Sequence, residues 1–288
     1  MILNDRMERW LRKAYYGLSP RMRRVARRVA FWPLDTWEGL RGIRPAHVPP
    51  RGKIFIGSGD FVQRGREQLG YLCSHAGLQP HHAVLDVGSG IGRTAVALAG
   101  YLGPEGRYEG FDVVKEGVDW CRRHITTKYP RFRFTHVDLV NDLYNLQGGT
   151  AQAFRFPYPD GSFDVVFLFS VFTHMAKEEV QHYLREIHRV LKPGGRCLGT
   201  YFLYTPELEE RISTGRGAFT FPVAGDGFRL MDGKVTAANI AFGEATLRDM
   251  ASAAGLQWEQ LLDGYWKDPA FKQAGRDFQD IVVLRRQA

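Results

Sequence analysis

The sequence has 288 residues, 44% of them hydrophobic and 24% charged, which is enough to bury the core of one large α/β domain. Its three cysteines, Cys73, Cys121 and Cys197, are far apart and form no CxxC pair, which excludes a disulfide framework and a thiolate zinc site. The formal charge of +8 is concentrated in residues 1–53, with 13 Lys and Arg against 4 Asp and Glu, so a chain-wide nucleic-acid surface is not expected.

The location of the protein is inferred from the same features. The first residues show no continuous apolar segment behind a basic one, and no stretch is long enough to cross a bilayer. Unpaired cysteines fit a reducing compartment. We therefore expect a soluble, unexported protein in the cytoplasm.

An N-terminal helical arm and linker are predicted over residues 1–60, ahead of a domain over 61–288. Apolar residues repeat with helical spacing over 7–18 and again over 22–29, which predicts two amphipathic helices. Proline and glycine then become frequent over 45–59, as is typical of a linker.

The second of these helices carries arginines opposite its apolar side and is followed by Phe31 and Trp32. Helices of this kind usually pack the apolar side on their own domain and leave the arginines in solvent, and we favour that interpretation. The alternative is peripheral contact of residues 21–32 with an anionic membrane.

The domain is predicted from an alternation of apolar runs and amphipathic segments, which indicates a Rossmann-like sheet of seven mostly parallel strands with helices on both faces. Strands or extended runs are expected over 83–87, 107–111, 132–137, 163–169, 196–203, 256–262 and 278–284, and helices over 61–77, 94–102, 115–128, 177–191 and 244–254. Residues 204–242 hold many glycines and aromatics with little periodicity, and we expect them to form a lid or substrate wall.

The most informative motif follows the first predicted strand of the sheet. There the segment Asp86-Val87-Gly88-Ser89-Gly90-Ile91-Gly92-Arg93 stands between a strand and a helix. A dinucleotide fold carries GxGxxG at this point, whereas this chain carries GxGxG with an acid two residues before the first glycine. Glycines admit a ligand close to the backbone, and a carboxylate attracts a cation and repels phosphate. The motif therefore favours S-adenosylmethionine, which carries an ammonium and a sulfonium but no phosphate.

This motif resembles motif I of the class I S-adenosylmethionine-dependent methyltransferases that act on small molecules, such as the ubiquinone and menaquinone C-methyltransferases. The resemblance extends over about residues 79–201 and again over 242–285. It implies that S-adenosylmethionine is held by residues along the carboxyl ends of the strands, namely Asp86, Gly88, Ser89, Gly90, Gly92, Arg93, Asp112, Val113, Asp138, Leu139, Phe169 and Ser170.

Two of these acids have individual roles in the resemblance. Asp112 ends the second strand, where the family uses an acid to accept hydrogen bonds from the ribose hydroxyls, and a helix N-cap is the alternative. Asp138 and Leu139 follow the third strand, where the family holds the adenine. A plain turn aspartate is the alternative for Asp138, since Asp142 lies close by.

The chemistry requires little of the protein, because methyl transfer is an in-line displacement and a hydroxyl acceptor needs only one base. His174 follows the fourth strand at the mouth of the expected cleft and is the candidate base, with a capping or packing histidine as the alternative. His174, His182 and His188 do not have metal-ligand spacing and no acid triplet is visible, so metal independence is expected.

The sequence is compatible with three functions. A methyltransferase for a small or lipid-like acceptor is favoured, with oxygen ahead of nitrogen or carbon because of His174. A nucleic-acid or protein methyltransferase that grips its substrate with the basic arm is the alternative, but Phe169-Ser170-Val171-Phe172 stands where amino-directed enzymes carry a [DN]PPY tetrapeptide, so no nucleic acid is expected. A scaffold without activity is disfavoured by the intact glycines and acids.

Overall fold

The computed structural model of the chain describes residues 20–57, 59–139, 148–214, 219–233 and 238–287. The strands of its main sheet are β1 (Ala83–Val87), β2 (Arg107–Asp112), β3 (Phe132–His136), β4 (Phe163–Leu168), β5 (Leu191–Tyr201), β10 (Leu256–Leu262) and β11 (Asp280–Arg286).

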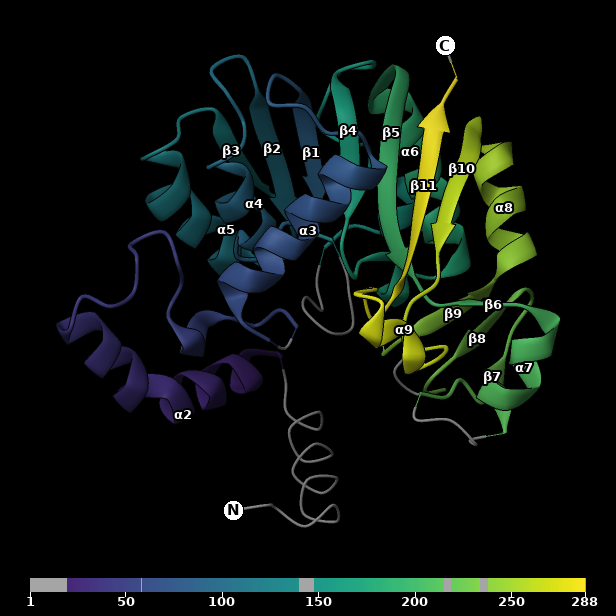
Figure 1. Cartoon of the computed structure of the whole chain (residues 1–288), viewed down its shortest axis with the longest axis horizontal. Helices are drawn as coiled ribbons and strands as arrows, with labels where there is room; N and C mark the ends of the chain where they lie inside the picture. Colours follow the sequence, from purple (N-terminus) through teal and green to yellow (C-terminus); the bar gives the residue numbers. More distant parts are fainter. Residues whose placement is uncertain (1–19, 58, 140–147, 215–218, 234–237, 288) are drawn as a thin grey trace.

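These seven strands of the described chain follow the order β10-β11-β5-β4-β1-β2-β3 (Figure 1). β11 runs antiparallel to β5 and β10, and the other pairs are parallel. The predicted Rossmann-like, mostly parallel sheet is thereby confirmed.

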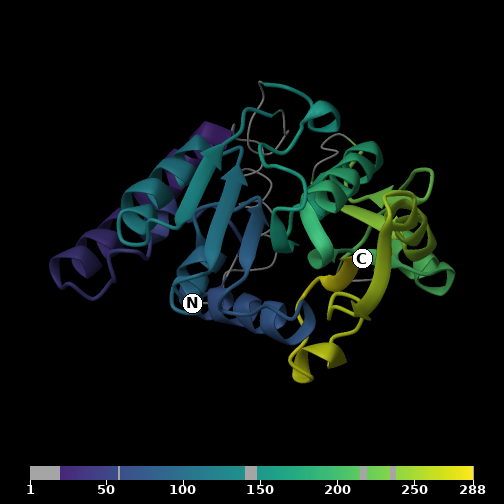
Figure 2. The ribbon, with the colours of Figure 1, turned by 90° about the horizontal axis from the view of Figure 1, so that it is seen from above.

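Helices cover both faces of this sheet, as expected. They are α3 (Phe61–His75), α4 (Arg93–Leu98) and α5 (Lys115–Cys121) on one face and α6 (Lys177–Val190) and α8 (Glu244–Ala253) on the other. Seen from above, α3 and α6 lie on opposite sides of the strands (Figure 2). Neighbouring residues of β1 serve both faces, because Val84 packs with Leu72 of α3 whereas Leu85 belongs to the α6 side.

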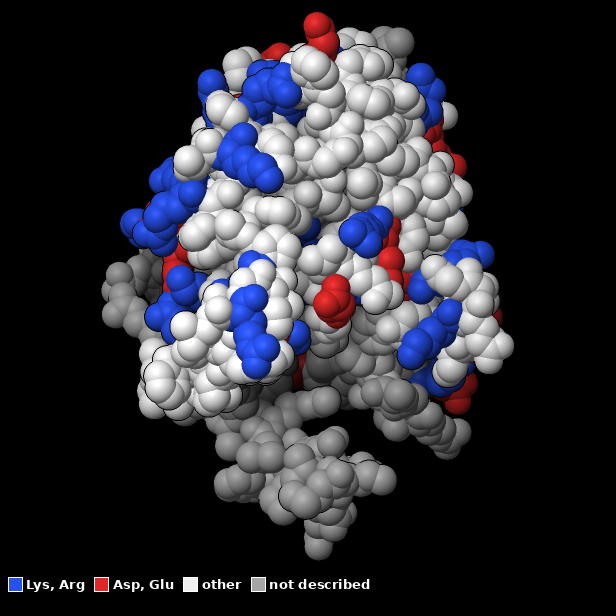
Figure 3. All heavy atoms as spheres, turned by 60° about the vertical axis from the view of Figure 1, so that its left-hand side comes forward, with Lys and Arg blue, Asp and Glu red and all other residues white. Residues whose placement is uncertain are grey.

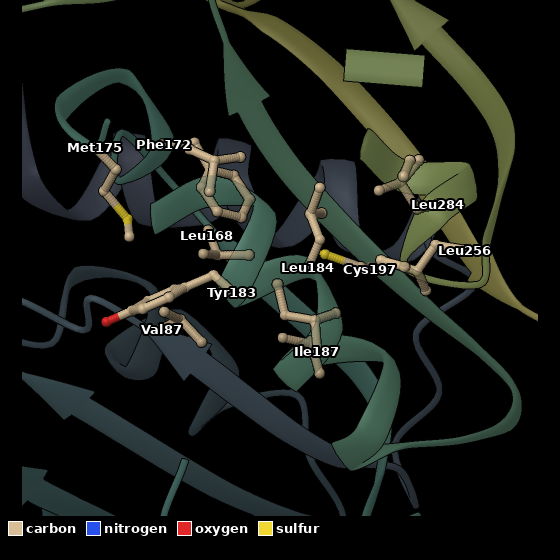
Figure 4. Close-up of a cluster of buried hydrophobic side chains, with 14 of the residues drawn as sticks. Val87, Leu168, Phe172, Met175, Tyr183, Leu184, Ile187, Cys197, Leu256 and Leu284 are labelled. Carbon is tan, nitrogen blue, oxygen red and sulfur yellow. The ribbon is translucent and has the colours of Figure 1, made fainter. Parts of the chain in front are cut away.

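The core on the α6 side closes the sheet next to the cavity described below. Tyr183 of α6 lies beside Val87 and Leu168 at the ends of β1 and β4, and Leu184 and Ile187 lie nearer Cys197 of β5 (Figure 4). Side chains one helical turn apart on α6 therefore bury the end of the sheet from which the loops emerge.

Some boundaries differ from those predicted. The helix expected over 115–128 ends as an α-helix at Cys121 and continues as a π-helical turn, Arg122–Thr126. The stretch 192–195, predicted to lie outside the sheet, falls within the bounds of β5 but forms a bulge, because Leu191 pairs with Phe163 and the next pair is Arg196 with Val165. Gly194 has a positive φ of 78°, so the turn preference of these residues is kept inside the strand.

The segment 204–242 has secondary structure of its own. Its described elements are β6 (Leu203–Tyr204), α7 (Pro206–Ser213), β7 (Val223–Ala224), β8 (Phe228–Leu230) and β9 (Ile240–Gly243), with the strands in the order β6-β9-β8-β7. Phe202, Phe221 and Trp266 form a separate aromatic core beneath them. The segment is a small second sheet rather than an aperiodic loop.

The arm is described from Pro20 onward, so the helix expected over 7–18 lies outside the described residues. The second helix, α2 (Pro20–Leu40), is longer than predicted. Across the chain described here, no helix has the length and apolar character needed to span a membrane.

The favoured interpretation of the arm is wrong in the structure. Arg24 and Arg28 of α2 pair with Glu116 of α5, so arginines face the domain. Val29 and Trp32, by contrast, are each 70% exposed. The apolar side of α2 faces solvent because ion pairs, and not apolar contacts, hold the helix to the domain.

Candidate functional site

A cavity of about 520 Å³ lies where the carboxyl ends of β1, β2 and β4 meet. The chain leaves β1 toward one side of the sheet and β4 toward the other, and open α/β sheets bind ligands at such a reversal. The volume lies within the range of about 300–1,000 Å³ found for small-molecule sites. Most predicted site residues line it, namely Asp86, Gly88, Ser89, Arg93, Asp112, Val113, Leu139, Phe169, Ser170 and His174.

The loop after β1 is shaped by its glycines, all three of which have positive φ. A Cβ on Gly88 would lie 2.4 Å from Cγ2 of Val171, which is itself a cavity residue. Gly90 and Gly92 approach Ile56 and Ile125 instead, and neither glycine lines the cavity. Gly88 therefore keeps the cavity open, whereas the other two glycines let the loop pack.

Asp86 is buried at the end of β1, and its Oδ2 accepts a hydrogen bond of 2.7 Å from the hydroxyl of Tyr108. Burial raises the pKa of Asp86 to about 7, with the Tyr108 hydrogen bond acting in the opposite direction and Asp112 adding to the rise. A carboxyl with a pKa raised in this way ionises most readily when a cation binds beside it.

Asp112 is held by two backbone amides. Its Oδ2 accepts from Gly90 N and its Oδ1 from Val114 N, both at 2.7 Å. Burial raises the pKa of Asp112 and the amides lower it. The N-cap of α5 is Val114, so Asp112 is not the helix N-cap that was the alternative for it. Each carboxylate oxygen keeps a further lone pair, which suits acceptance from ligand hydroxyls.

Asp138 differs from its neighbour Leu139. Leu139 lines the cavity, whereas Asp138 is not among the lining residues, and its backbone carbonyl accepts from Gly149 N at 2.9 Å. The adenine-binding role and the turn alternative for Asp138 both stay predictions.

Two polar side chains of the glycine loop have atoms without hydrogen-bond partners in the described structure. Ser89 Oγ and Arg93 Nε are both buried in this state. Arg93 Nη2 donates to the Ile56 carbonyl at 2.7 Å, and burial lowers the pKa of Arg93 to about 10. Buried polar atoms of this kind usually have a partner, so they favour a ligand that supplies one.

Ser170 was expected at the cavity, and it is the one non-glycine residue with positive φ in the described ranges, at 58°. Its neighbours from the end of the chain, Asp277 and Gln279, also line the cavity but were not predicted from the sequence. The Ser170 hydroxyl donates to Gln279 at 2.8 Å, and Arg64 of α3 donates to the cavity residue Asp277 at 2.8 Å. The reversed direction of β11 brings its amino end to this edge, and that topology was the signal for residues 277–279.

Comparison with known proteins bears on the family, because residues 85–199 match a family described as a methyltransferase domain. This part of the chain is a methyltransferase domain. The match agrees with the expectation, from the residues around Asp86, that S-adenosylmethionine is the methyl donor.

Two curated relatives illustrate the proteins to which the chain is similar. The chain is 30% identical over 236 residues to the sterol 24-C-methyltransferase of Yarrowia lipolytica, which covers 78% of this chain and 55% of that protein. It is 32% identical over 119 residues to the demethylmenaquinone methyltransferase of Listeria monocytogenes, with coverages of 41% and 44%. The chain thus spans about half the length of the curated relatives it matches.

A solved structure supports the fold of the chain. The crystal structure of the PH0226 protein from Pyrococcus horikoshii OT3 aligns with a TM-score of 0.55 at 15% identity, over 82% of this chain and 95% of that one. At this identity the likeness concerns the fold alone.

Other lining residues of the cavity are mainly apolar. They come from the loop after β4, from α6 and from the segment after β3, namely Ala151, Val171, His174, Met175, Glu179 and Tyr183. His174 ends a short 3-10 turn, Phe172–His174, and its backbone amide donates to the Val171 carbonyl at 2.9 Å. No group of three His, Cys, Asp or Glu suited to a metal ion occurs in the described ranges.

Proposed function

We propose that the chain transfers a methyl group from S-adenosylmethionine to a hydroxyl of a small, lipid-like acceptor, with His174 as the base. The observation that carries the proposal is that two chemically different sets of residues line the cavity. The first set comprises the buried carboxyls and the glycine loop, and the second is mainly apolar but includes His174 and Glu179. A cationic cofactor suits the first set and an apolar acceptor the second.

The first set of residues suits the cofactor, which supplies a methyl group on a positively charged sulfur. Asp86 is placed to offset positive charge, and Asp112 to accept hydrogen bonds from ribose hydroxyls. Gly88 leaves space for the ligand, and Ser89 offers a buried hydroxyl that still needs a partner.

The second set of residues would hold the acceptor. Met175 and Tyr183 bound it with apolar surface and exclude water, which favours an acceptor with little polar surface. His174 would take the proton that the acceptor hydroxyl loses as the oxygen is methylated.

The test measures formation of S-adenosylhomocysteine with a panel of apolar phenols, alcohols, amines and quinones, and identifies the methylated atom by mass spectrometry. His174→Asn is expected to lower kcat on a hydroxyl acceptor by about 10²–10⁴-fold while the affinity for S-adenosylmethionine is unchanged. His182→Asn is the matched control, because His182 contacts the Phe154 carbonyl and does not line the cavity. Full activity of His174→Asn would exclude His174 as the base.

C-methylation is the second candidate reaction. A specific finding favours it, since a relative that aligns with 78% of this chain is named a sterol 24-C-methyltransferase. The same panel separates the two reactions, because only C-methylation leaves the methyl group on carbon and every acceptor hydroxyl free.

A further inference from the structure

The exposed side of α2 carries an apolar stripe. Val25, Val29 and Trp32 follow one another at helical spacing, and Leu40 lies on the same side beyond Thr36, with exposed fractions of 70% for Trp32 and 85% for Leu40. Ile43 extends the stripe beyond the helix and is also exposed. Single exposed apolar residues are normal, but a stripe over about four turns of helix marks a surface that binds something apolar.

The orientation of this stripe is fixed by the opposite side of α2. Asp35 accepts hydrogen bonds from the amides of Arg51 and Gly52 at 2.7 and 2.8 Å. Glu38 pairs with Arg51 at 2.9 Å, and Arg28 pairs with Glu116 of α5. Since the polar side is attached to the domain, the apolar side points away from it.

A basic cluster lies beside α2. A shallow depression is lined mainly by the loop after α2 and the end of the α5 segment, with His47, Arg123, His124 and Lys128 among its residues. Burial and Lys128 lower the pKa of His47, and burial, Lys53 and Arg123 lower that of His124. Basic side chains outnumber acidic ones on this face of the molecule (Figure 3). An anionic partner would offset the electrostatic repulsion among these basic side chains.

We propose that α2 lies in the surface of an anionic phospholipid bilayer, with Val25, Val29 and Trp32 among the acyl chains and the basic cluster against the lipid phosphates. A bilayer fits better than an apolar peptide or a second copy, because it offers apolar depth and negative charge along one continuous surface. Trp32 in particular suits the boundary between head groups and chains.

The position of α2 connects this proposal to the proposed function, on which it rests for the nature of the acceptor. α2 lies on the side of the carboxyl ends of the parallel strands (Figure 1), where the cavity also lies. Phe55 and Ile56, which follow the arm, line the cavity. A bilayer bound to α2 would therefore lie near the route by which a lipid-like acceptor enters.

The experiment is co-sedimentation of the full chain, without cofactor, with vesicles of phosphatidylcholine alone or mixed in equal parts with phosphatidylglycerol. Binding to the mixed vesicles is expected, with much weaker binding to the neutral ones. The double variant Val29→Asp, Trp32→Asp is expected to stay in the supernatant. Val223→Asp, on the exposed β7 strand, is the matched control and is expected to bind as the unaltered chain does.

The basic cluster is tested separately. Arg123→Glu with Lys128→Glu is expected to weaken binding by at least about tenfold, because each basic residue at an anionic surface is worth roughly fivefold in affinity. Arg185→Glu, on the exposed side of α6, is the control for a charge change elsewhere.

Three results would overturn the proposal: no binding of the unaltered chain to mixed vesicles, equal binding of the Val29, Trp32 variant, or a stripe variant that alters only self-association in sedimentation velocity. Titration of each variant with S-adenosylmethionine distinguishes this failure from failure of the proposed function, since the stripe residues do not line the cavity.

Discussion

Asp86 is a buried carboxyl whose charge depends on what lies beside it. Because burial raises its pKa to about 7, the ligand-free site holds a mixture of the neutral and charged forms near neutral pH. A bound cation favours the charged form, so binding of S-adenosylmethionine releases a proton over this range.

The first prediction concerns this linkage. The affinity for S-adenosylmethionine is expected to rise by roughly tenfold between about pH 6 and about pH 8, and Asp86→Asn is expected to bind more weakly with a flat pH profile. Titration calorimetry in buffers of different ionisation enthalpy measures both the affinity and the proton release. A variant that retains the pH dependence would show that another group is responsible.

The same pKa predicts an effect on stability. A carboxyl whose folded pKa is raised stabilises the fold most below its unfolded pKa, near 4, and that contribution is lost as the pH rises to about 7. Asp86→Asn is therefore expected to raise the free energy of unfolding of the ligand-free protein at about pH 8, by roughly 1–3 kcal/mol. Urea unfolding at low and high pH checks this, and a variant less stable than the unaltered chain at high pH would contradict it.

Gly88 and Gly161 form a matched pair of glycines with positive φ, at 81° and 60°. A Cβ on Gly88 meets Val171 at 2.4 Å, whereas a Cβ on Gly161 meets nothing within 4 Å. Gly161→Ala is expected to lose only about 1–2 kcal/mol of stability and to bind the cofactor normally. Gly88→Ala is expected to lose cofactor binding, measured by calorimetry, and equal binding by the two variants would exclude the role given to Gly88.

At the residue scale, the sequence predicted the loop but not the function of each position within it. The GxGxG spacing identified the site, yet only the packed structure separates Gly88, which lines the cavity, from Gly90 and Gly92, which do not. Gln279 escaped prediction because it comes from the far end of the chain and carries no motif.

At the scale of elements, periodicity predicted helices and strands well but not which side of a helix is buried. The apolar pattern of α2 is compatible with either side of the helix facing the domain. Its orientation is set by Glu116 and by the amides of Arg51 and Gly52, which lie outside the helix. The small sheet within 204–242 was missed because its strands have only two to four residues, too few to show an alternation.

Asp35 is predicted to be the main attachment of α2. Asp35→Ala removes the acceptor of two backbone amides and is expected to weaken docking of α2 by about 1–3 kcal/mol. Amide hydrogen exchange should then be faster in α2 and in residues 51–53, with the main sheet unchanged. Thr36→Ala is the control, because its hydroxyl contacts only the Trp32 carbonyl within the helix. Unchanged exchange in Asp35→Ala would contradict this assignment.

At the scale of the whole molecule, the fold follows from alternation of strand and helix and from the reversed last strand. Parallel pairing places the carboxyl ends of β1, β2 and β4 together, which brings Asp86, Asp112 and His174 to one cavity although 88 residues separate the first from the last. The sequence could predict this convergence. The shape of the cavity around His174 depends on packing between α6 and two loops, and no motif predicts it.

The central claim is that this cavity holds a positively charged nucleoside. Titration calorimetry of the full chain with S-adenosylmethionine, S-adenosylhomocysteine, ATP and NAD tests it most directly. We predict saturable binding of the first two ligands at one site per chain, with S-adenosylmethionine binding weakened by Asp86→Asn, and no binding of the phosphate-bearing nucleotides. Binding of ATP or NAD in place of S-adenosylmethionine, or of none of the four, would contradict the account.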